Sequence, residues 1–502
     1  MVYLVGAGPG DPGLITAKGL DCLRRAALVI CDYLVNPILL QSANATAEVV
    51  RLGHHDGDDL SPDEIHARLI AAARQGRVAV HLKGGDPDVF GRCAEETAAL
   101  QAAGVSYEVV PGVTAALAAA AYAGIPLTHG AAASAVAFIT GHQRRDHRPP
   151  LDYAQLGNFP GTLVFYMGMS SAADWAGALV AHGRPPQTLV AVVRRCSWPD
   201  QQVTRCTLAT LAATIAKDNL RPPAVIVVGE VVAAMPAVAW FAARPLFGQR
   251  VMVTRPRGES AALCARLMEL GAEVLDQPAI EIGPPADWRP VDAALTQLDR
   301  YDWLVFSSAN GVSYFLDRLF AGGGDARRLG GMKLAAIGPG TAEALAPYGL
   351  RADLVPDEFR AEALAEALVA VCQGGGAAGA APVRFLLVRA SRGREVLAER
   401  LSAAGASVTQ VVAYESCDVA AADPAIAAAL AAGQVDWITV TSSAIARSLV
   451  RLFGEDLRRA RLASISPLTS GVLAELGFPS AAEAARYTIE GVVAAIAAGS
   501  AE

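Results

Sequence analysis

The chain has 502 residues, of which 53% are hydrophobic and 18% are charged, and its net charge is −7. This length predicts about three or four folding units, and the apolar content is enough for several cores, which excludes wholesale disorder. The acidic balance, without a basic tract, argues against nucleic acid as a partner.

Short apolar runs alternate with helix-like stretches through the first 230 residues. The first strand is predicted at Val2-Tyr-Leu-Val, a start that lacks the basic and then apolar regions of a secretory signal. Further strands are predicted at 27–30, 78–82 and 107–110, which is an α/β pattern. The most apolar run, 113–127, contains Gly124 and Pro126 and is shorter than the roughly 20 residues that a bilayer requires. We therefore predict no membrane span and a cytoplasmic location.

A domain boundary is predicted near residues 244–248, between the strand-like run 224–229 and a new strand at Val251-Met-Val-Thr. The second half contains an internal repeat. Asp302-Trp matches Asp436-Trp, and Arg255 matches Arg389, both at the same offset (436 − 302 = 389 − 255 = 134). Matches in the same order predict two duplicated α/β lobes, with ligand groups in the loops at the carboxyl ends of parallel strands and a cleft between the lobes.

Five segments of the first half carry its chemistry. They are Val5-Gly-Ala-Gly-Pro-Gly-Asp-Pro, Leu82-Lys-Gly-Gly-Asp-Pro, Val110-Pro-Gly-Val-Thr-Ala-Ala, Gly124-Ile-Pro-Leu-Thr-His and Thr162-Leu-Val-Phe-Tyr-Met-Gly. The glycine-rich loop alone fits either a tight turn or a nucleotide-binding loop. Asp86 suits a ribose or ammonium ligand, or a helix N-cap. Met167 suits a wall beside a sulfonium, or a core position.

In this order the five segments resemble the tetrapyrrole methylase family, and within it the uroporphyrinogen-III C-methyltransferases, over residues 1–243. The resemblance implies two α/β subdomains, a homodimer and S-adenosylmethionine as methyl donor. The cofactor contacts that it implies are Pro9, Gly84, Gly85, Asp86, Val89, Thr114, Ala115, Met167 and Cys196.

The resemblance also implies catalytic residues. A proton must leave the macrocycle after methylation, and Asp32 stands where the family has a candidate base, with a loop cap as its alternative role. His54 stands where the family has a lysine proton donor, and a surface histidine fits equally well. The eight cysteines include no CxxC and no close Cys/His pair, so no metal is predicted.

The second half, residues 246–502, resembles the uroporphyrinogen-III synthase family through Val253-Thr-Arg-Pro, Val305-Phe-Ser-Ser-Ala-Asn-Gly-Val, Ile337-Gly-Pro-Gly-Thr and Val412-Ala-Tyr-Glu. The resemblance implies two flavodoxin-like lobes joined by a two-stranded linker. Lobe one would comprise 246–280 and 415–502, and lobe two 281–414.

That family closes hydroxymethylbilane with inversion of ring D, a reaction that requires a shaped cleft and donors for eight carboxylates. Tyr414 matches a tyrosine proton donor near the linker. Substrate-binding candidates are Arg255, Ser307, Ser308, Asn310, Thr341, Arg389, Thr441, Ser442, Ser443 and Thr469. Helix N-termini favour anions, but N-capping for the hydroxyls and salt bridges for the arginines are open alternatives.

Because the product of one family is the substrate of the other, the two resemblances support each other. We expect a bifunctional enzyme that makes uroporphyrinogen III and methylates it at C2 and C7 to precorrin-2, towards cobalamin or sirohaem. Three alternatives stay open. The first half could act on a later precorrin, the second half could be a noncatalytic two-lobed binding module, or the first half could be an unrelated small-molecule or RNA methyltransferase.

Overall fold

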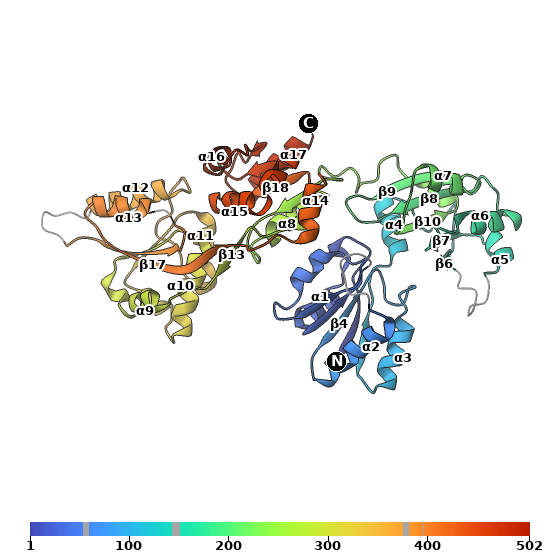
Figure 1. Ribbon diagram of the computed structural model, residues 1–502, viewed down its shortest axis with the longest axis horizontal. Coiled ribbons are helices and arrows are strands. Elements are labelled where there is room, and N and C mark those ends of the chain that lie inside the picture. Colours follow the sequence, from blue (N-terminus) through green and yellow to red (C-terminus); the bar gives the residue numbers. More distant parts are fainter. Residues whose placement is uncertain (54–59, 143–150, 375–380, 394, 502) are drawn as a thin grey trace.

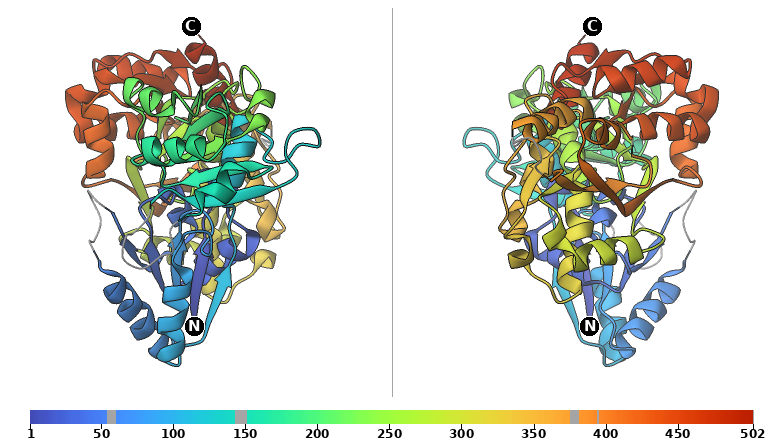
Figure 2. Two further views of the ribbon diagram at one scale, coloured as in Figure 1. Left: turned by 90° about the vertical axis from the view of Figure 1, so that its right-hand side faces the viewer. Right: turned by 90° about the vertical axis from the view of Figure 1, so that its left-hand side faces the viewer.

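The computed structural model describes residues 1–53, 60–142, 151–374, 381–393 and 395–501. The structure contains four five-stranded sheets, each flanked by helices. In Figure 1 the second sheet lies at the right, the first sheet lies below the centre, and the third and fourth sheets follow towards the left. The first sheet lies at the end of the molecule opposite the C-terminus (Figure 2). The predicted α/β class is therefore confirmed.

The first sheet is entirely parallel, with strand order β3-β2-β4-β1-β5. Its strands are β1 (Val2–Gly6), β2 (Leu28–Cys31), β3 (Glu48–Arg51), β4 (Ala79–Lys83) and β5 (Tyr107–Val110). Its helices are α1 (Ala17–Arg25), α2 (Pro62–Arg74) and α3 (Cys93–Ala102). Since the strands are parallel, the loops after β1, β2, β4 and β5 meet at one edge.

The second sheet is mixed, with order β6-β7-β10-β8-β9, and α4 (Ala115–Ala123) leads into it. Its strands are β6 (Val136–Thr140), β7 (Thr162–Tyr166), β8 (Leu189–Arg194), β9 (Gln202–Thr207) and β10 (Ala224–Val228). Its helices are α5 (Tyr153–Gly157), α6 (Ala172–Ala181) and α7 (Leu211–Lys217). Only β6 and β7 run parallel to each other.

The third sheet has the parallel order β12-β11-β18-β19-β20, the 2-1-3-4-5 order of flavodoxin-like domains. Its strands are β11 (Arg250–Val253), β12 (Glu273–Asp276), β18 (Trp437–Val440), β19 (Arg461–Ser464) and β20 (Ala482–Glu483). Its helices are α8 (Ala261–Glu269), α14 (Pro424–Ala431), α15 (Ser443–Phe453), α16 (Pro467–Glu475) and α17 (Ile489–Ser500).

The fourth sheet has the order β13-β17-β16-β14-β15. Its strands are β13 (Ile280–Gly283), β14 (Trp303–Phe306), β15 (Lys333–Ala336), β16 (Arg384–Ala390) and β17 (Ser407–Asp418). Its helices are α9 (Arg289–Thr296), α10 (Ala309–Ala321), α11 (Pro339–Glu343), α12 (Ala361–Gly374) and α13 (Val396–Ala403). Antiparallel pairing of β13 with β17 forms a two-stranded crossing between the sheets, as predicted (Figure 1).

The sequence repeat corresponds to two equivalent hydrogen bonds at the start of the strands. Asp302, just before β14, accepts a hydrogen bond from the Arg384 N–H at the start of β16 (2.8 Å). Asp436, just before β18, accepts one from the Arg250 N–H at the start of β11 (2.7 Å). Each aspartate therefore joins the first residues of two neighbouring strands in its own lobe.

Candidate active sites

Four glycines at the carboxyl edge of the first sheet bring backbone into contact with backbone. Gly85, after β4, exchanges hydrogen bonds with Gly8, after β1. A Cβ on Gly112 would lie 2.3 Å from the Gly85 carbonyl oxygen, and a Cβ on Gly6 would lie 2.6 Å from the Gly112 nitrogen. Because no side chain fits between these loops, the edge presents peptide groups to whatever binds there.

Asp86 ties two of these loops together. Its Oδ1 accepts hydrogen bonds from the N–H groups of Asp88 (2.9 Å) and Val89 (3.2 Å), and its Oδ2 accepts one from the N–H of Gly112 (3.0 Å). The carboxylate thus fixes the turn that contains Gly84 and Val89. This is a loop anchor rather than the helix N-cap considered as its alternative role.

Residues of the second methylase subdomain lie against the segment that follows β5 at this edge. The Tyr166 hydroxyl lies 2.7 Å from the Thr114 hydroxyl and accepts from the Ala116 N–H (2.8 Å). Met167 follows with a positive φ of 51° and is half exposed. Cys196 is buried, its thiol donates to the Ala115 carbonyl (3.7 Å), and burial raises its pKa to about 12.

Trp198 makes a further connection between the two methylase subdomains at this edge. Its indole N–H donates to the Pro9 carbonyl (3.1 Å), next to the glycine-rich loop. The structure therefore brings the predicted cofactor residues from both subdomains to one edge.

Asp32, the predicted base, is the exposed end of a buried chain of charged side chains. Its Oδ1 lies 3.1 Å from His81 Nε2, and His81 Nδ1 lies 2.8 Å from Glu96 Oε2. Glu96 Oε1 in turn bonds the Lys83 ammonium. His81, Glu96 and Lys83 are buried, whereas the Asp32 side chain keeps 29% of its surface exposed.

The pKa values of Asp32, His81 and Glu96 shift in the directions expected of paired charges. Burial favours a higher pKa for Asp32 and for Glu96, but the hydrogen bond and charge of His81, together with the charge of Lys83, outweigh burial and lower both pKa values. For His81, burial favours a lower pKa, and the bonds to Asp32 and Glu96 raise it. The geometry and the pKa directions agree on a charged network.

The sequence analysis did not identify this network. His81 and Lys83 occupy alternate positions of one buried strand and so point to the same face, under α3. The sequence did contain a signal for this network, because His81 and Lys83 lie on one face of an otherwise apolar strand. Basic side chains are buried only when they have partners, so acidic side chains were to be expected beside them. His54 lies outside the described residues.

In the second half, Tyr414 lies at the crossing between lobes and contacts the start of α10. Its hydroxyl donates to Ser308 Oγ (2.9 Å), and its ring stacks on Tyr314 with centroids 5.9 Å apart. Burial raises the Tyr414 pKa, and the bond to Ser308 opposes this rise only in part. The phenol is therefore a neutral hydrogen-bond donor.

Arg255 and Asn310 share one carboxylate, which belongs to Glu259. Arg255 Nη2 lies 2.7 Å from Glu259 Oε2, and Asn310 Nδ2 donates to Glu259 Oε1 (2.7 Å). Arg255 and Glu259 follow β11 in lobe one, whereas Asn310 belongs to α10 in lobe two. Glu259, which sequence reasoning missed, thus spans the two lobes.

The hydroxyl candidates divide into caps and buried groups. Ser308 and Ser442 are N-caps of α10 and α15, where they accept from the N–H of Gly311 (3.0 Å) and Ile445 (3.2 Å). Thr341 and Thr469 are buried at 7% and 2% exposure. The capping alternative therefore describes these serines, whereas the two threonines are buried residues of α11 and α16.

The other candidates lie at the same strand ends. Ser307 donates to the Val388 carbonyl (3.2 Å), and Thr441 and Ser443 flank the cap of α15, partly exposed. Arg389 forms an ion pair with Glu395 and a hydrogen bond with Gln410, both within lobe two. In this structure Arg389 therefore makes a salt bridge, which was the alternative to binding a substrate carboxylate.

Comparisons with known proteins relate each half of the chain to a family. A family model for tetrapyrrole (corrin/porphyrin) methylases matches residues 1–212, and one for uroporphyrinogen-III synthase HemD matches residues 261–494. The porphyrin biosynthesis protein HemD of Ruminiclostridium josui is 37% identical over 365 residues, 72% of this chain and 72% of that protein. The chain belongs to both families, as a fusion. It is an enzyme of tetrapyrrole biosynthesis.

The chain is also similar to two further relatives and to a solved structure. The uroporphyrinogen-III C-methyltransferase of Bacillus subtilis is 35% identical over 336 residues, 66% of this chain and 68% of that protein. The siroheme synthase of Sodalis glossinidius is 44% identical over 250 residues, about half of each chain (50% and 52%). A solved uroporphyrin-III C-methyl transferase from Thermus thermophilus, complexed with S-adenyl homocysteine, is 39% identical over 47% of this chain and 99% of that chain, with a TM-score of 0.41.

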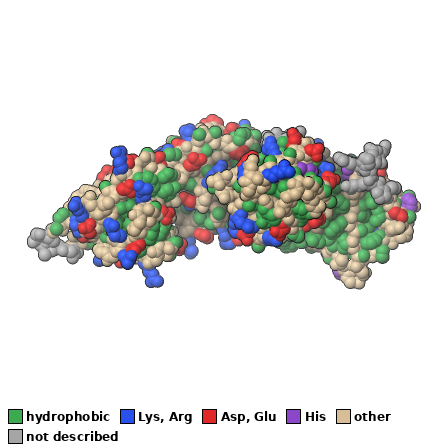
Figure 3. Space-filling view, turned by 90° about the horizontal axis from the view of Figure 1, so that it is seen from below, with side chains coloured by type: hydrophobic (Ala, Val, Ile, Leu, Met, Phe, Trp, Pro, Cys, Tyr) green, Lys and Arg blue, Asp and Glu red, His purple; other side chains and the backbone are tan. Residues whose placement is uncertain are grey.

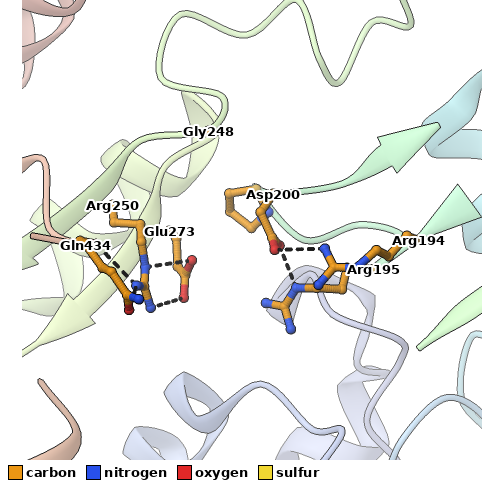
Figure 4. A pocket seen from close by; sticks show the side chains of 8 residues that line it. Arg194, Arg195, Asp200, Gly248, Arg250, Glu273 and Gln434 are labelled. Carbon is orange, nitrogen blue, oxygen red and sulfur yellow. Dashed lines mark hydrogen bonds and ion pairs between the residues drawn. The ribbon is translucent and has the colours of Figure 1, made fainter. Parts of the chain in front are cut away.

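The methylase half and the synthase half of the fusion touch directly. The Gln41 amide donates to Asp276 (2.7 Å), and the Gly248 N–H donates to the Pro199 carbonyl (3.0 Å). Beside this contact is a cavity of about 490 Å³ lined by charged side chains from both halves (Figure 4). Arg194 and Arg195 share Asp200, and Arg250 pairs with Glu273, so the lining has one more arginine than carboxylates, on the methylase side.

Within the described ranges, no group of three or more His, Cys, Asp or Glu side chains is arranged to hold a metal ion. Among the helices of those ranges, none combines the length and apolarity of a membrane span.

Proposed function

We propose that the synthase half converts hydroxymethylbilane to uroporphyrinogen III, and that the methylase half then methylates this product at C2 and C7 to give precorrin-2. The observation that carries the proposal is the presence of both families in one chain, because the product of the first reaction is the substrate of the second. The siroheme synthases among the relatives favour sirohaem as the destination.

S-adenosylmethionine fits the edge where the two methylase sheets meet. Loops packed through Gly6, Gly85 and Gly112 have no side chain between them, which allows a nucleoside to approach the backbone closely. Half-exposed Met167 supplies a polarisable thioether for a sulfonium. When bound, the cofactor supplies the electrophilic methyl group, and the chain contributes chiefly by holding both reactants in line.

Asp32 is the base in this proposal. Methylation leaves a cationic macrocycle whose C–H is acidic, so a carboxylate of low pKa is basic enough to take the proton. Asp32 lies at the carboxyl end of β2, beside the glycine loops, and its side chain remains accessible. Asp32→Asn is expected to lower the methylation rate by about 10²-fold or more while the cofactor still binds.

In the synthase half, Tyr414 donates a proton to the departing hydroxyl of the linear substrate. Its raised pKa keeps the proton on the phenol at neutral pH, and Ser308 orients it. Arg255, Asn310 and the helix N-termini at Ser308 and Ser442 supply donors for carboxylates of the substrate. The active site of this half is therefore a binding cleft with one proton donor.

We also propose that the chain acts in the cytoplasm as a homodimer formed through its methylase half. Seen from below, hydrophobic side chains gather at the right-hand end of the molecule, where the methylase sheets lie (Figure 3). Exposed apolar side chains of that half include Leu117 (51%) and Phe138 (39%). Contiguous apolar surface of this kind favours association with a second copy.

The deciding experiment gives the purified protein hydroxymethylbilane with and without S-adenosylmethionine, followed by oxidation of the products and determination of isomer and mass. Uroporphyrin III without the cofactor and a dimethylated product with it would establish both activities. Isomer I without methylation would refute the proposal. A type III product that gains no methyl would indicate that the methylase half uses a later precorrin.

A further inference from the structure

The contact between His81 and Asp32 assigns a role to a residue that the proposed mechanism does not use. Both ring nitrogens of His81 face carboxylate oxygens, Asp32 Oδ1 at 3.1 Å and Glu96 Oε2 at 2.8 Å. An ionised carboxylate only accepts hydrogen bonds, so a neutral imidazole would place one lone pair against an oxygen. The geometry requires a ring with a proton on each nitrogen, and hence a cation.

The other residues around His81 are apolar and by themselves disfavour its charged form, so its charge depends on the two carboxylates. On the neighbouring strands, Leu4 and Ile30 are the residues paired with it, and α2 adds Leu69 and Ala72 to the apolar cluster on this face of the sheet. Cys93 of α3 belongs to the same cluster, and burial raises its pKa to about 12, so it remains a neutral thiol.

The other charged groups facing His81 are Asp32, which follows β2, Glu96 of α3 and Lys83 of β4. Two carboxylates then balance one imidazolium and one ammonium, so the buried network is neutral overall. Removing one member would leave an uncompensated charge, which is costly at this depth.

We propose that His81 is a positioning residue for Asp32: as an imidazolium clamped by Glu96, it keeps the Asp32 carboxylate ionised and fixed in place for proton abstraction during methyl transfer. The proposal rests on the proposed function of the methylase half. One Asp32 oxygen is held by a buried partner that itself cannot move, because Glu96 is bound on its other oxygen by Lys83. The exposed part of the carboxylate then has a defined direction.

The test compares His81→Gln with His81→Arg in the full chain. Glutamine keeps a hydrogen-bond donor but removes the charge, whereas arginine keeps the charge and several donors. The measurement is kcat/KM for methylation of uroporphyrinogen III between pH 4 and 8, together with the Kd for S-adenosylmethionine. The Kd for S-adenosylmethionine reports whether the mutated methylase half is folded, and the synthase activity shows that the other half is unchanged. The wild type and both variants act on the same substrate, so ionisation of the substrate carboxylates cannot explain a difference between their pH profiles.

We expect the acid limb of the profile to move up by about one pH unit or more in His81→Gln, since loss of a neighbouring cation raises a carboxyl pKa by roughly that amount. In His81→Arg the acid limb should stay at its wild-type pH. The Kd for S-adenosylmethionine should remain within about twofold of the wild-type value in both variants. A lower rate in His81→Gln with an unmoved acid limb would overturn the inference.

The same experiment separates this inference from the function on which it rests. If the wild-type chain adds no methyl group to uroporphyrinogen III, the proposed function fails first. If the wild type methylates and Asp32→Asn abolishes methylation, but His81→Gln keeps the wild-type profile, the proposed function stands and the role of His81 is refuted.

Discussion

Asn310 donates a hydrogen bond from Nδ2 to Oε1 of Glu259, 2.7 Å away, and this bond joins lobe two to lobe one of the synthase half. The other oxygen of Glu259 holds Arg255 at 2.7 Å. A protein carboxylate therefore occupies the two donors that we assign to a substrate carboxylate. Binding of the substrate through either donor requires that Glu259 give way.

Glu259→Gln is accordingly expected to lower the KM for hydroxymethylbilane about two- to fivefold, because the value of a partly exposed ion pair, up to about 1 kcal/mol, no longer opposes binding. Initial rates of uroporphyrinogen III formation measure this KM. Glu269→Gln is the matched control, since it removes the same charge from an exposed pair with Arg266. An unchanged or higher KM in Glu259→Gln alone would contradict the assignment of Arg255 and Asn310.

Tyr414→Phe should lower the synthase kcat by about 10²-fold while leaving KM within about threefold, because it removes a proton donor and keeps the ring. The lost bond to Ser308 should cost roughly 1 kcal/mol of folding stability. The isomer ratio measures the defect, since substrate that escapes closes spontaneously to isomer I. Tyr314→Phe makes the same chemical change in the stacked neighbour and should retain activity.

Gly112→Ala should weaken binding of S-adenosylmethionine by at least about tenfold, since the new methyl would meet the Gly85 carbonyl at 2.3 Å and push the two loops apart. Calorimetric titration measures this affinity. Gly177→Ala, within α6 and with nothing near its Cβ position, should leave the affinity unchanged and stabilise the helix by about 0.5–1 kcal/mol. Equal affinities in the two variants would show that the glycine packing does not shape the cofactor site.

The stability that His81 confers should depend on pH in a defined window. The His81 pKa is raised above 6.5 in the folded chain, so its contribution is complete below pH 6.5 and is lost as pH rises through the folded value. The pKa values of Asp32 and Glu96 are lowered below 3.8 and 4.5, so their contributions are complete above pH 4.5 and are lost as pH falls through the folded values.

Hydrogen exchange of residues 79–110 should therefore differ most between the wild type and His81→Gln from pH 4.5 to 6.5, compared at equal pH. The difference should shrink on either side of that window. Peptides of the synthase half serve as the control, because His81→Gln changes nothing there. A difference that grows above pH 7 would contradict an imidazolium at this position.

The sequence predicted the architecture well because its signals are local and repeated. The strands predicted at 2–5 and 251–254 appear as β1 and β11, and the offset of 134 residues placed Asp302 and Asp436 at equivalent strand starts. The crossing of β13 with β17 came from the family resemblance and is present. Periodicity and repetition carry this information within a few residues.

The side-chain partnerships were not predictable in the same way. Glu259 meets Asn310 across 51 residues of sequence, and His81 meets Asp32 across 49. Such pairs depend on which loops a parallel sheet brings to one edge, and this is fixed by strand order rather than by local pattern. The isolated glycines of the cofactor edge were visible in the sequence, but their mutual packing was not.

The pairing of β11 with β18, Val251 with Trp437, has a consequence for how the protein is made. As the chain leaves the ribosome, both methylase sheets and the whole of the fourth sheet are complete once residue 418 has emerged. The third sheet then still consists of β11 and β12 alone, with the β11 edge unpaired until Trp437 arrives. Lobe one therefore finishes last although it starts before lobe two, and a nascent chain stalled between residues 418 and 437 exposes an apolar strand edge to other chains.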